Sequence, residues 1–325
     1  MLPLHNTVDT IVGLNNDSRI GKTNSSTYTP AQLTKLHIVE KLFHKHCHLP
    51  TRFDLMACED CLYPKYFTYT NINKYMFLYT HSYEFNIKFF LNQLATIDWK
   101  FMEVDLENIF NNDEISDKYE LFDAPNETFD TIFFLPGSNI DYLIDYSKIS
   151  EVLSKNENTL LKPHPLTTQK HLSIYGNLFG WDKIIEPKIS GYQLLNKSKT
   201  VYHTDNSEIG FHAYLKKDKK VKHFNISNLA QPMPYHAFYH IIRQNAADHL
   251  DNHGLINAFF KPQFGMFNLE NNIDTIKNDL MAFLYDLECF RERFKPEAHL
   301  FDRNTFEKHL EEKREAKKNV ELQTN

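Results

Sequence analysis

Cysteine is scarce in this chain, and long apolar runs are absent. Four cysteines among 325 residues do not make a disulfide framework, which indicates a reducing, cytoplasmic compartment. No stretch approaches the roughly 18 uncharged apolar residues that suggest a membrane-spanning helix. The opening MLPLHNTVDT lacks the basic start and apolar core of a signal peptide. We therefore expect a cytoplasmic protein with no transmembrane segment, and a peripheral position at the membrane is the alternative.

The overall composition is that of a globular protein with a slightly acidic balance. The chain is 42% hydrophobic and contains 26 Phe and 17 Tyr, which supply enough apolar surface for two domain cores. The formal charge of 36 − 42 = −6 argues against a broad nucleic-acid-binding surface, although a local basic patch is compatible with it. Nucleic acid is therefore an unlikely partner that the composition does not exclude.

The second half of the chain alternates short apolar runs with helical patterns, which predicts βαβ units and a mostly parallel sheet. The first run, FDTIFFLP, ends at a Pro-Gly turn, and the following helical stripe has Ser138 or Asn139 as its expected N-cap. Asn206 or Ser207 is the expected cap of a later helix. The predicted strands are residues 129–136, 158–163, 181–187, 199–204 and 219–226, and the predicted helices are residues 138–155 and 206–217.

Three polar loops follow these strands. They are PGSN (136–139), KPHP (162–165) and HTDNSE (203–208). Ligands of parallel sheets bind outside the carboxyl ends of the strands. We therefore expect the three loops to gather at one edge and to form a ligand site there.

The first half is less regular. Residues 74–97 are predicted to form a strand, a loop and a helix, and residues 99–105 another strand. A polar stretch at 111–128 indicates a domain boundary. We expect an N-terminal acceptor-side α/β domain (1–120), a nucleotide-sugar-binding Rossmann-like domain (121–270), and a C-terminal helix with a charged tail (271–325). Within the last segment, residues 272–294 carry one apolar face, which predicts a helix packed on a core.

The histidine in LLKPHPLTT is held between two prolines, which restrict the backbone and preset the direction of the imidazole. Lys162 adds a positive charge beside His164. The predicted helix that begins near Ser207 would bring free backbone N–H groups to the same edge, and these favour an anion. This combination is suited to a phosphate or diphosphate group.

The motif KPHP, followed by HTDNSEIGFHAYLKKDKKV, resembles the C-terminal half of GT-B glycosyltransferases. The nearest subset is the bacterial sialyltransferase and capsule-polymer transferase type, which has a histidine-proline motif and a later hydroxyl-containing motif. The resemblance spans residues 131–224, under a third of the chain. This chain departs from the family's commoner pair of hydroxyl residues, because it has Asp205-Asn206-Ser207 at that place. The resemblance implies two Rossmann-like domains that face a cleft, and a nucleotide-activated donor, often a CMP-sugar.

The resemblance also implies roles for individual residues. His164 is the expected phosphate contact and general acid, Pro165 fixes it, and Thr204 and Ser207 match the hydroxyl positions. Glu208 opens a helix, and the alternative to a donor-binding role is that it only complements the helix dipole. For Gly137 the alternative is that it only permits a turn. The expected donor-binding residues are Gly137, Ser138, Lys162, Pro165, Thr204, Ser207 and Glu208.

These features predict a metal-independent glycosyltransferase of polysaccharide biosynthesis that needs no cofactor. It would transfer a sugar to a hydroxyl of a glycan or a lipid-linked saccharide. Asp17 and Glu84, with His81 beside the latter, are the candidate general bases of the first half. A glycosyltransferase that modifies a DNA base is one alternative.

A zinc-stabilised α/β binding protein without catalysis is the other alternative. Cys58 and Cys61 have the spacing of a zinc knuckle, and His44, His46, Cys47 and His48 lie upstream as further ligands. The single C-x-x-C pair makes these cysteines weak zinc candidates. His236 and His240 lack the glutamate of a zincin motif, and we interpret them as ordinary helix surface.

Overall fold

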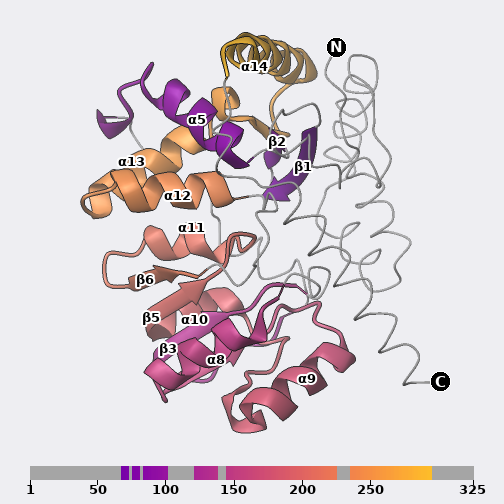
Figure 1. Ribbon diagram of the computed structural model, residues 1–325, viewed down its shortest axis with the longest axis vertical. Helices are drawn as coiled ribbons and strands as arrows, with labels where there is room; N and C mark the ends of the chain where they lie inside the picture. The colour runs from indigo at the N-terminus through magenta and orange to yellow at the C-terminus, as the bar shows by residue number, and fades with distance from the viewer. Residues whose placement is uncertain are drawn as a thin grey trace, which may run out of the picture.

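The computed structural model describes residues 67–72, 75–80, 83–101, 121–137, 144–224 and 235–294. These residues form a mixed α/β structure with one parallel and one antiparallel sheet. In Figure 1 the parallel sheet and its helices occupy the lower part of the molecule, and the antiparallel sheet and its helices the upper part. No helix in these ranges is long and apolar enough to cross a membrane.

The parallel sheet consists of β3 (Phe129–Phe134), β4 (Thr159–Lys162), β5 (Ser198–His203) and β6 (Lys220–His223). The strand order is β4-β3-β5-β6, and every neighbouring pair is parallel. Three of these strands lie within segments that the sequence predicted as strands, and β5 begins one residue before its predicted segment, so four of the five predicted strands are confirmed.

Helices cover both faces of this sheet. They are α8 (Tyr146–Lys155), α9 (Gln169–Phe179), α10 (Gly191–Lys197) and α11 (Ile209–Tyr214). Because side chains alternate along a strand, Phe133 of β3 packs with the residues of α8 and α9, while Ile132 and Phe134 pack with those of α10 and α11. The middle of β3 is therefore buried on both faces, which explains its run of apolar residues Ile132, Phe133 and Phe134.

Three local predictions in this part are wrong. Residues 181–187 do not form a strand but a 3-10 turn, η4 (Trp181–Lys183), followed by a single bridge from Ile184 to Leu161. Helix α8 is capped by Asp145, whose carboxylate accepts from the Ser147 N–H, and not by Ser138 or Asn139. The N-cap of α11 is Glu208, which makes no capping bond, and not Asn206 or Ser207.

The antiparallel sheet has the order β1-β2-β7, with β1 (Phe67–Ile72), β2 (Tyr75–Thr80) and β7 (Met266–Asn268). The helices beside it are α5 (Tyr83–Leu94), α12 (His236–Asn245), α13 (His249–Phe259) and α14 (Ile273–Arg293). Two 3-10 turns, η2 (Trp99–Phe101) and η5 (Pro262–Phe264), complete the described elements. The strand and the helix predicted within residues 74–97 are confirmed, whereas the strand predicted at 99–105 begins as a 3-10 turn. A second Rossmann-like domain stays a prediction.

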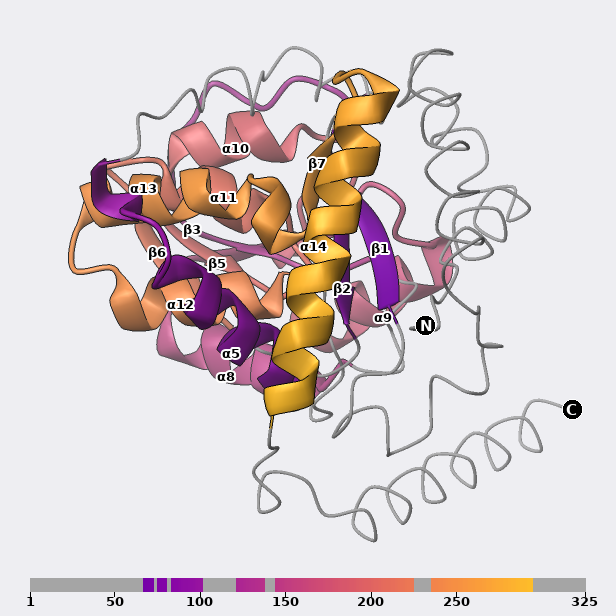
Figure 2. The same ribbon diagram turned by 90° about the horizontal axis from the view of Figure 1, so that it is seen from above.

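The core beside the antiparallel sheet joins distant parts of the chain. Phe77 of β2 and Phe90 of α5 pack against Phe238 of α12, with ring centroids 4.7 and 4.9 Å apart. Helix α14, predicted at 272–294, is confirmed and lies over β7 and η5 (Figure 2). Its buried side chains are Ile276, Leu280, Phe283 and Leu287.

Helix α11 connects the two cores because all six of its residues are buried. Its Ala213 packs in the core beside the parallel sheet, while Phe211 packs among the aromatic residues of α12 and β2. The loop that precedes α11 is thus fixed between the parallel sheet and α12.

Candidate functional site

The carboxyl edge of the parallel sheet brings the predicted loops together. The loop that begins at Leu135 follows β3, the loop Pro163–Pro165 follows β4, and the loop Thr204–Ser207 follows β5. Since β3 lies between β4 and β5, the last two loops start about 10 Å apart, two strand spacings. The strand order changes direction at β3, which is where sheets of this kind bind ligands.

His164 has a fixed tautomer in the loop after β4. The backbone N–H of Leu166 donates to its Nδ1 at 3.1 Å. An N–H group can only donate, so Nδ1 accepts, and the neutral ring carries its proton on Nε2. The His164 carbonyl accepts from the Thr167 N–H at 2.9 Å, which closes a tight turn after Pro165. The half-buried imidazole therefore presents an N–H donor at Nε2.

Lys162 is brought to the same loop, but its amine is directed at the protein backbone. Nζ donates to the carbonyls of Pro163 at 2.7 Å and Pro187 at 2.8 Å. The side chain is buried, and burial lowers the lysine pKa to about 7, against an opposing effect of Glu186. In this arrangement Lys162 fastens the loop after β4 to the segment that follows η4.

The loop after β5 is held by its own hydrogen bonds. The buried Thr204 hydroxyl donates to Asn206 Oδ1 at 2.7 Å, and the Ser207 N–H donates to the Thr204 carbonyl at 3.0 Å. The Tyr239 hydroxyl on α12 donates to the Ser207 carbonyl at 2.5 Å. Ser207 and Glu208 are half-buried. Because α11 has only six residues, its dipole contributes little to anion binding at this loop.

The other predicted site residues are placed as follows. Gly137 is buried directly after β3, at the same edge. Glu84 lies in the first turn of α5, and its carboxylate pairs with Lys88 at 2.6 Å. The remaining candidates lie outside the described residues: Asp17, Cys58, Cys61, His81 and Ser138, together with the histidines upstream of Cys58.

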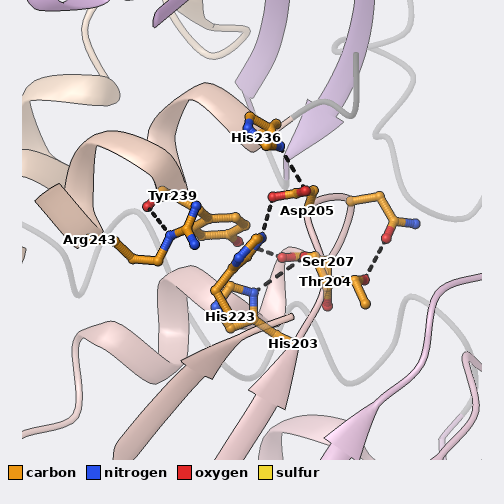
Figure 3. Close-up of polar contacts among 9 residues, drawn as sticks. His203, Thr204, Asp205, Ser207, His223, His236, Tyr239 and Arg243 are labelled. Carbon is orange, nitrogen blue, oxygen red and sulfur yellow. Dashed lines mark hydrogen bonds and ion pairs between the residues drawn. The ribbon is translucent and has the colours of Figure 1, made fainter. Parts of the chain in front are cut away.

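A buried histidine cluster at this edge was not predicted from the sequence (Figure 3). Asp205 lies between two imidazoles, with Oδ1 in contact with His223 Nε2 and Oδ2 2.7 Å from His236 Nδ1. The side chains of Asp205 and His223 are each 3% exposed, and that of His236 is 10% exposed. The interpretation of His236 as helix surface is therefore wrong, because the start of α12 packs on the loop after β5.

The two imidazoles keep Asp205 ionised. Burial alone would raise the pKa of this carboxyl, but the contacts with His223 and His236 outweigh burial and hold the pKa well below its usual range. Burial lowers the pKa of His236, and Asp205 partly opposes this shift. A buried carboxylate that contacts an imidazole nitrogen fixes the orientation and the tautomer of the ring.

His203, the last residue of β5, completes the cluster. Its side chain is fully buried, and burial is the main cause that lowers its pKa to about 3, so the ring is neutral. Nδ1 lies 3.3 Å from the Thr204 carbonyl, and Nε2 has no hydrogen-bond partner within the described ranges. The ring packs on Tyr239 with centroids 4.5 Å apart. A Cβ atom on Gly210 would lie 2.6 Å from His203 Nδ1 and from the Tyr239 hydroxyl, so only glycine fits there.

Partial signals for this cluster are present in the sequence. His203 and Asp205 belong to the HTDNSE loop, and His223 stands at the end of a predicted strand. The contact of Asp205 with His236 depends on how α12 packs against the loop. Local periodicity in the sequence does not encode that packing. In the described part of the chain, no three or more His, Cys, Asp or Glu side chains are grouped to hold a metal ion.

Comparison with known proteins gives no relative. No family model matches the chain, and neither a curated protein nor a solved structure is significantly similar to it.

Proposed function

We propose that this protein is a metal-independent glycosyltransferase whose donor is a nucleotide-activated sugar bound at the carboxyl edge of the parallel sheet. A CMP-sugar is the donor that the histidine-proline motif favours. The acceptor is a hydroxyl group of a glycan or of a lipid-linked saccharide.

The observation that carries this proposal is the tautomer of the His164 ring. Its Nδ1 accepts from Leu166, so the proton of the neutral ring lies on Nε2, the atom that we propose donates to a phosphate oxygen of the donor. A preorganised donor of this kind stabilises charge that develops on a leaving group. The flanking prolines and the lysine-bound backbone of Pro163 keep the ring in place.

The loop after β5 supplies the second support. This loop begins about 10 Å, two strand spacings, from the start of the loop that carries His164, a separation that suits the length of a nucleotide. Asp205 and the histidines around it hold this loop against α12. We therefore assign the Thr204–Ser207 loop to the nucleoside end of the donor and His164 to its phosphate.

The proposed reaction is a substitution at the anomeric carbon. The acceptor oxygen forms the new bond to this carbon as the bond to the phosphate oxygen breaks. The acceptor proton passes to a general base, for which Asp17, His81 and Glu84 remain the candidates. The electron pair of the broken bond stays on the nucleotide, where the N–H of His164 donates to the phosphate oxygen, as a hydrogen bond or with full proton transfer.

A nucleotide panel tests this function. Purified protein is titrated with CMP, CDP, UDP and GDP, and binding is read as a rise in melting temperature and by calorimetry. We expect one nucleotide to bind and His164→Ala to weaken it. His171→Ala, at the start of the helix after the same loop, is the control and should bind like the wild type. If no nucleotide binds, the proposal is wrong.

A further inference from the structure

Two histidines of α13 meet a backbone carbonyl at the end of α11. His249 is the first residue of α13, and His253 lies one helical turn later. The Nε2 atoms of the two rings are 3.1 Å apart. The Leu215 carbonyl oxygen is 2.9 Å from the first and 3.1 Å from the second. Three potential electron-pair donors thus form a nearly equilateral triangle.

Hydrogen bonds leave one contact of this triangle between like groups. A neutral imidazole has one proton, and a carbonyl oxygen has none. If both Nε2 atoms are protonated, each can donate to Leu215, but the two N–H groups then lie side by side with their nitrogens only 3.1 Å apart. If only one Nε2 is protonated, the lone pair of the other ring faces the carbonyl oxygen. In each case one of the three contacts brings together two donors or two acceptors, which repel each other.

A metal ion would make all three contacts favourable. Ligand atoms about 2.1 Å from a metal ion and at right angles to one another lie about 3.0 Å apart. The separations of 2.9, 3.1 and 3.1 Å match one face of such an octahedron. Imidazole nitrogen is a preferred ligand of Zn²⁺, Ni²⁺ and Cu²⁺. Both histidines are half-buried, so water can occupy the outer positions.

We propose that His249, His253 and the Leu215 carbonyl bind a divalent transition-metal ion such as Zn²⁺, with water as the remaining ligands. The ion ties the end of α11 to α13, and α11 begins directly after the Thr204–Ser207 loop. The site is separate from the proposed donor site, and its role is structural. It is also separate from the cysteine pair at 58 and 61.

Calorimetric titration of the EDTA-stripped full chain with ZnCl₂, and separately with NiCl₂, tests the site. We expect a bound equivalent whose affinity falls at least tenfold in His249→Asn/His253→Asn, because asparagine can still donate to the carbonyl but is a poor ligand for these ions. His171→Asn is the control for a histidine elsewhere. Cys58→Ser/Cys61→Ser should keep this equivalent, and loss of the whole signal in that variant would assign the metal to the cysteines and overturn the proposal.

A second measurement needs no variant. Zn²⁺ should protect His249 and His253 from modification by diethylpyrocarbonate, as mapped by mass spectrometry, while His171 stays reactive. Bound Zn²⁺ should also raise the melting temperature of the wild type but not of the double variant. If the metal gives no protection and the double variant differs only by a lower melting temperature in EDTA, the histidines merely cap the helix end, and the proposal is wrong.

Discussion

The carboxylate of Asp205 lies 2.7 Å from His236 Nδ1 and so joins the loop after β5 to the first turn of α12. The backbone reinforces this junction, since the Tyr235 N–H donates to the Asp205 carbonyl at 3.1 Å. An ionised, buried residue therefore joins the parallel sheet to the aromatic core of α12, in addition to the packing of α11.

Asp205→Asn should destabilise the protein by about 3 kcal/mol, because an amide keeps one acceptor but turns an N–H toward the other imidazole. Asp218→Asn is the matched control: Asp218 pairs with Lys219 at 2.8 Å but is largely exposed. Urea unfolding at pH 7 measures both variants. Equal, small losses in the free energy of unfolding of the two variants would show that the Asp205 contacts add little stability.

His203 should make stability fall as the solution is acidified. Its folded pKa is about 3, below the unfolded value of 6.5, so between these pH values the unfolded chain binds a proton that the folded chain does not. At pH 5 this difference amounts to about 2 kcal/mol. In His203→Asn, the loss of stability between pH 7.5 and pH 5 should be smaller by that amount. Parallel urea titrations at the two pH values test this, and identical losses would contradict it.

Lys162→Met should lower stability by about 2 kcal/mol, because the carbonyls of Pro163 and Pro187 lose their donor. Lys199→Met is the control, since Lys199 pairs with Asp130 on the surface. The sequence analysis placed Lys162 among the donor-binding residues, and a donor-binding lysine would chiefly affect nucleotide affinity. Weaker binding with unchanged melting temperature would favour that earlier interpretation.

The effect of Lys162 should also depend on pH. Its folded pKa is about 7, below the unfolded value of 10.5. Between pH 7 and pH 10 the unfolded chain therefore holds the extra proton, so stability rises with pH in the wild type. The difference in melting temperature between wild type and Lys162→Met should widen from pH 7 to pH 9. A constant difference would mean that the amine stays charged.

Gly210→Ala should be strongly destabilising, since the added Cβ would lie 2.6 Å from His203 Nδ1 and the Tyr239 hydroxyl. Gly191→Ala is the control at the start of α10, where the nearest atom, on Phe134, is 3.4 Å away and alanine is the better helix former. Thermal melts should show a large loss for the first variant and little change for the second. Similar melting temperatures of the two variants would mean that the surroundings of His203 and Tyr239 are loosely packed.

His164→Ala should reduce turnover about a hundredfold, the effect of removing one transition-state donor. The fold should survive because the half-buried side chain lies in a loop at a strand end. Donor turnover is compared with that of His171→Ala, and circular dichroism checks folding. Full activity would remove His164 from the mechanism, and unfolding would show that the ring is structural.

Local pattern in the sequence determined the strands of the parallel sheet and helix α14. A short apolar run that ends at proline or a polar cluster encodes a buried strand and its end, as in FDTIFFLP and NTLLKP. A repeat of apolar residues every three or four positions encodes α14. The parallel arrangement followed from this alternation, and it was enough to predict that the loops after β3, β4 and β5 share one edge.

Tertiary structure alone decided which side chains meet at that edge. Asp205 is buried only because α12 packs its first turn there, and the pattern that makes α12 a helix does not specify its partner. Lys162 turns inward because carbonyls from two segments converge on it. Residues 181–187 were predicted as a strand and contain the β-branched pair Ile184 and Ile185, yet only Ile184 bridges to the sheet. Apolar periodicity fixes an element and its buried face, whereas contacts between distant segments depend on how those faces pack together.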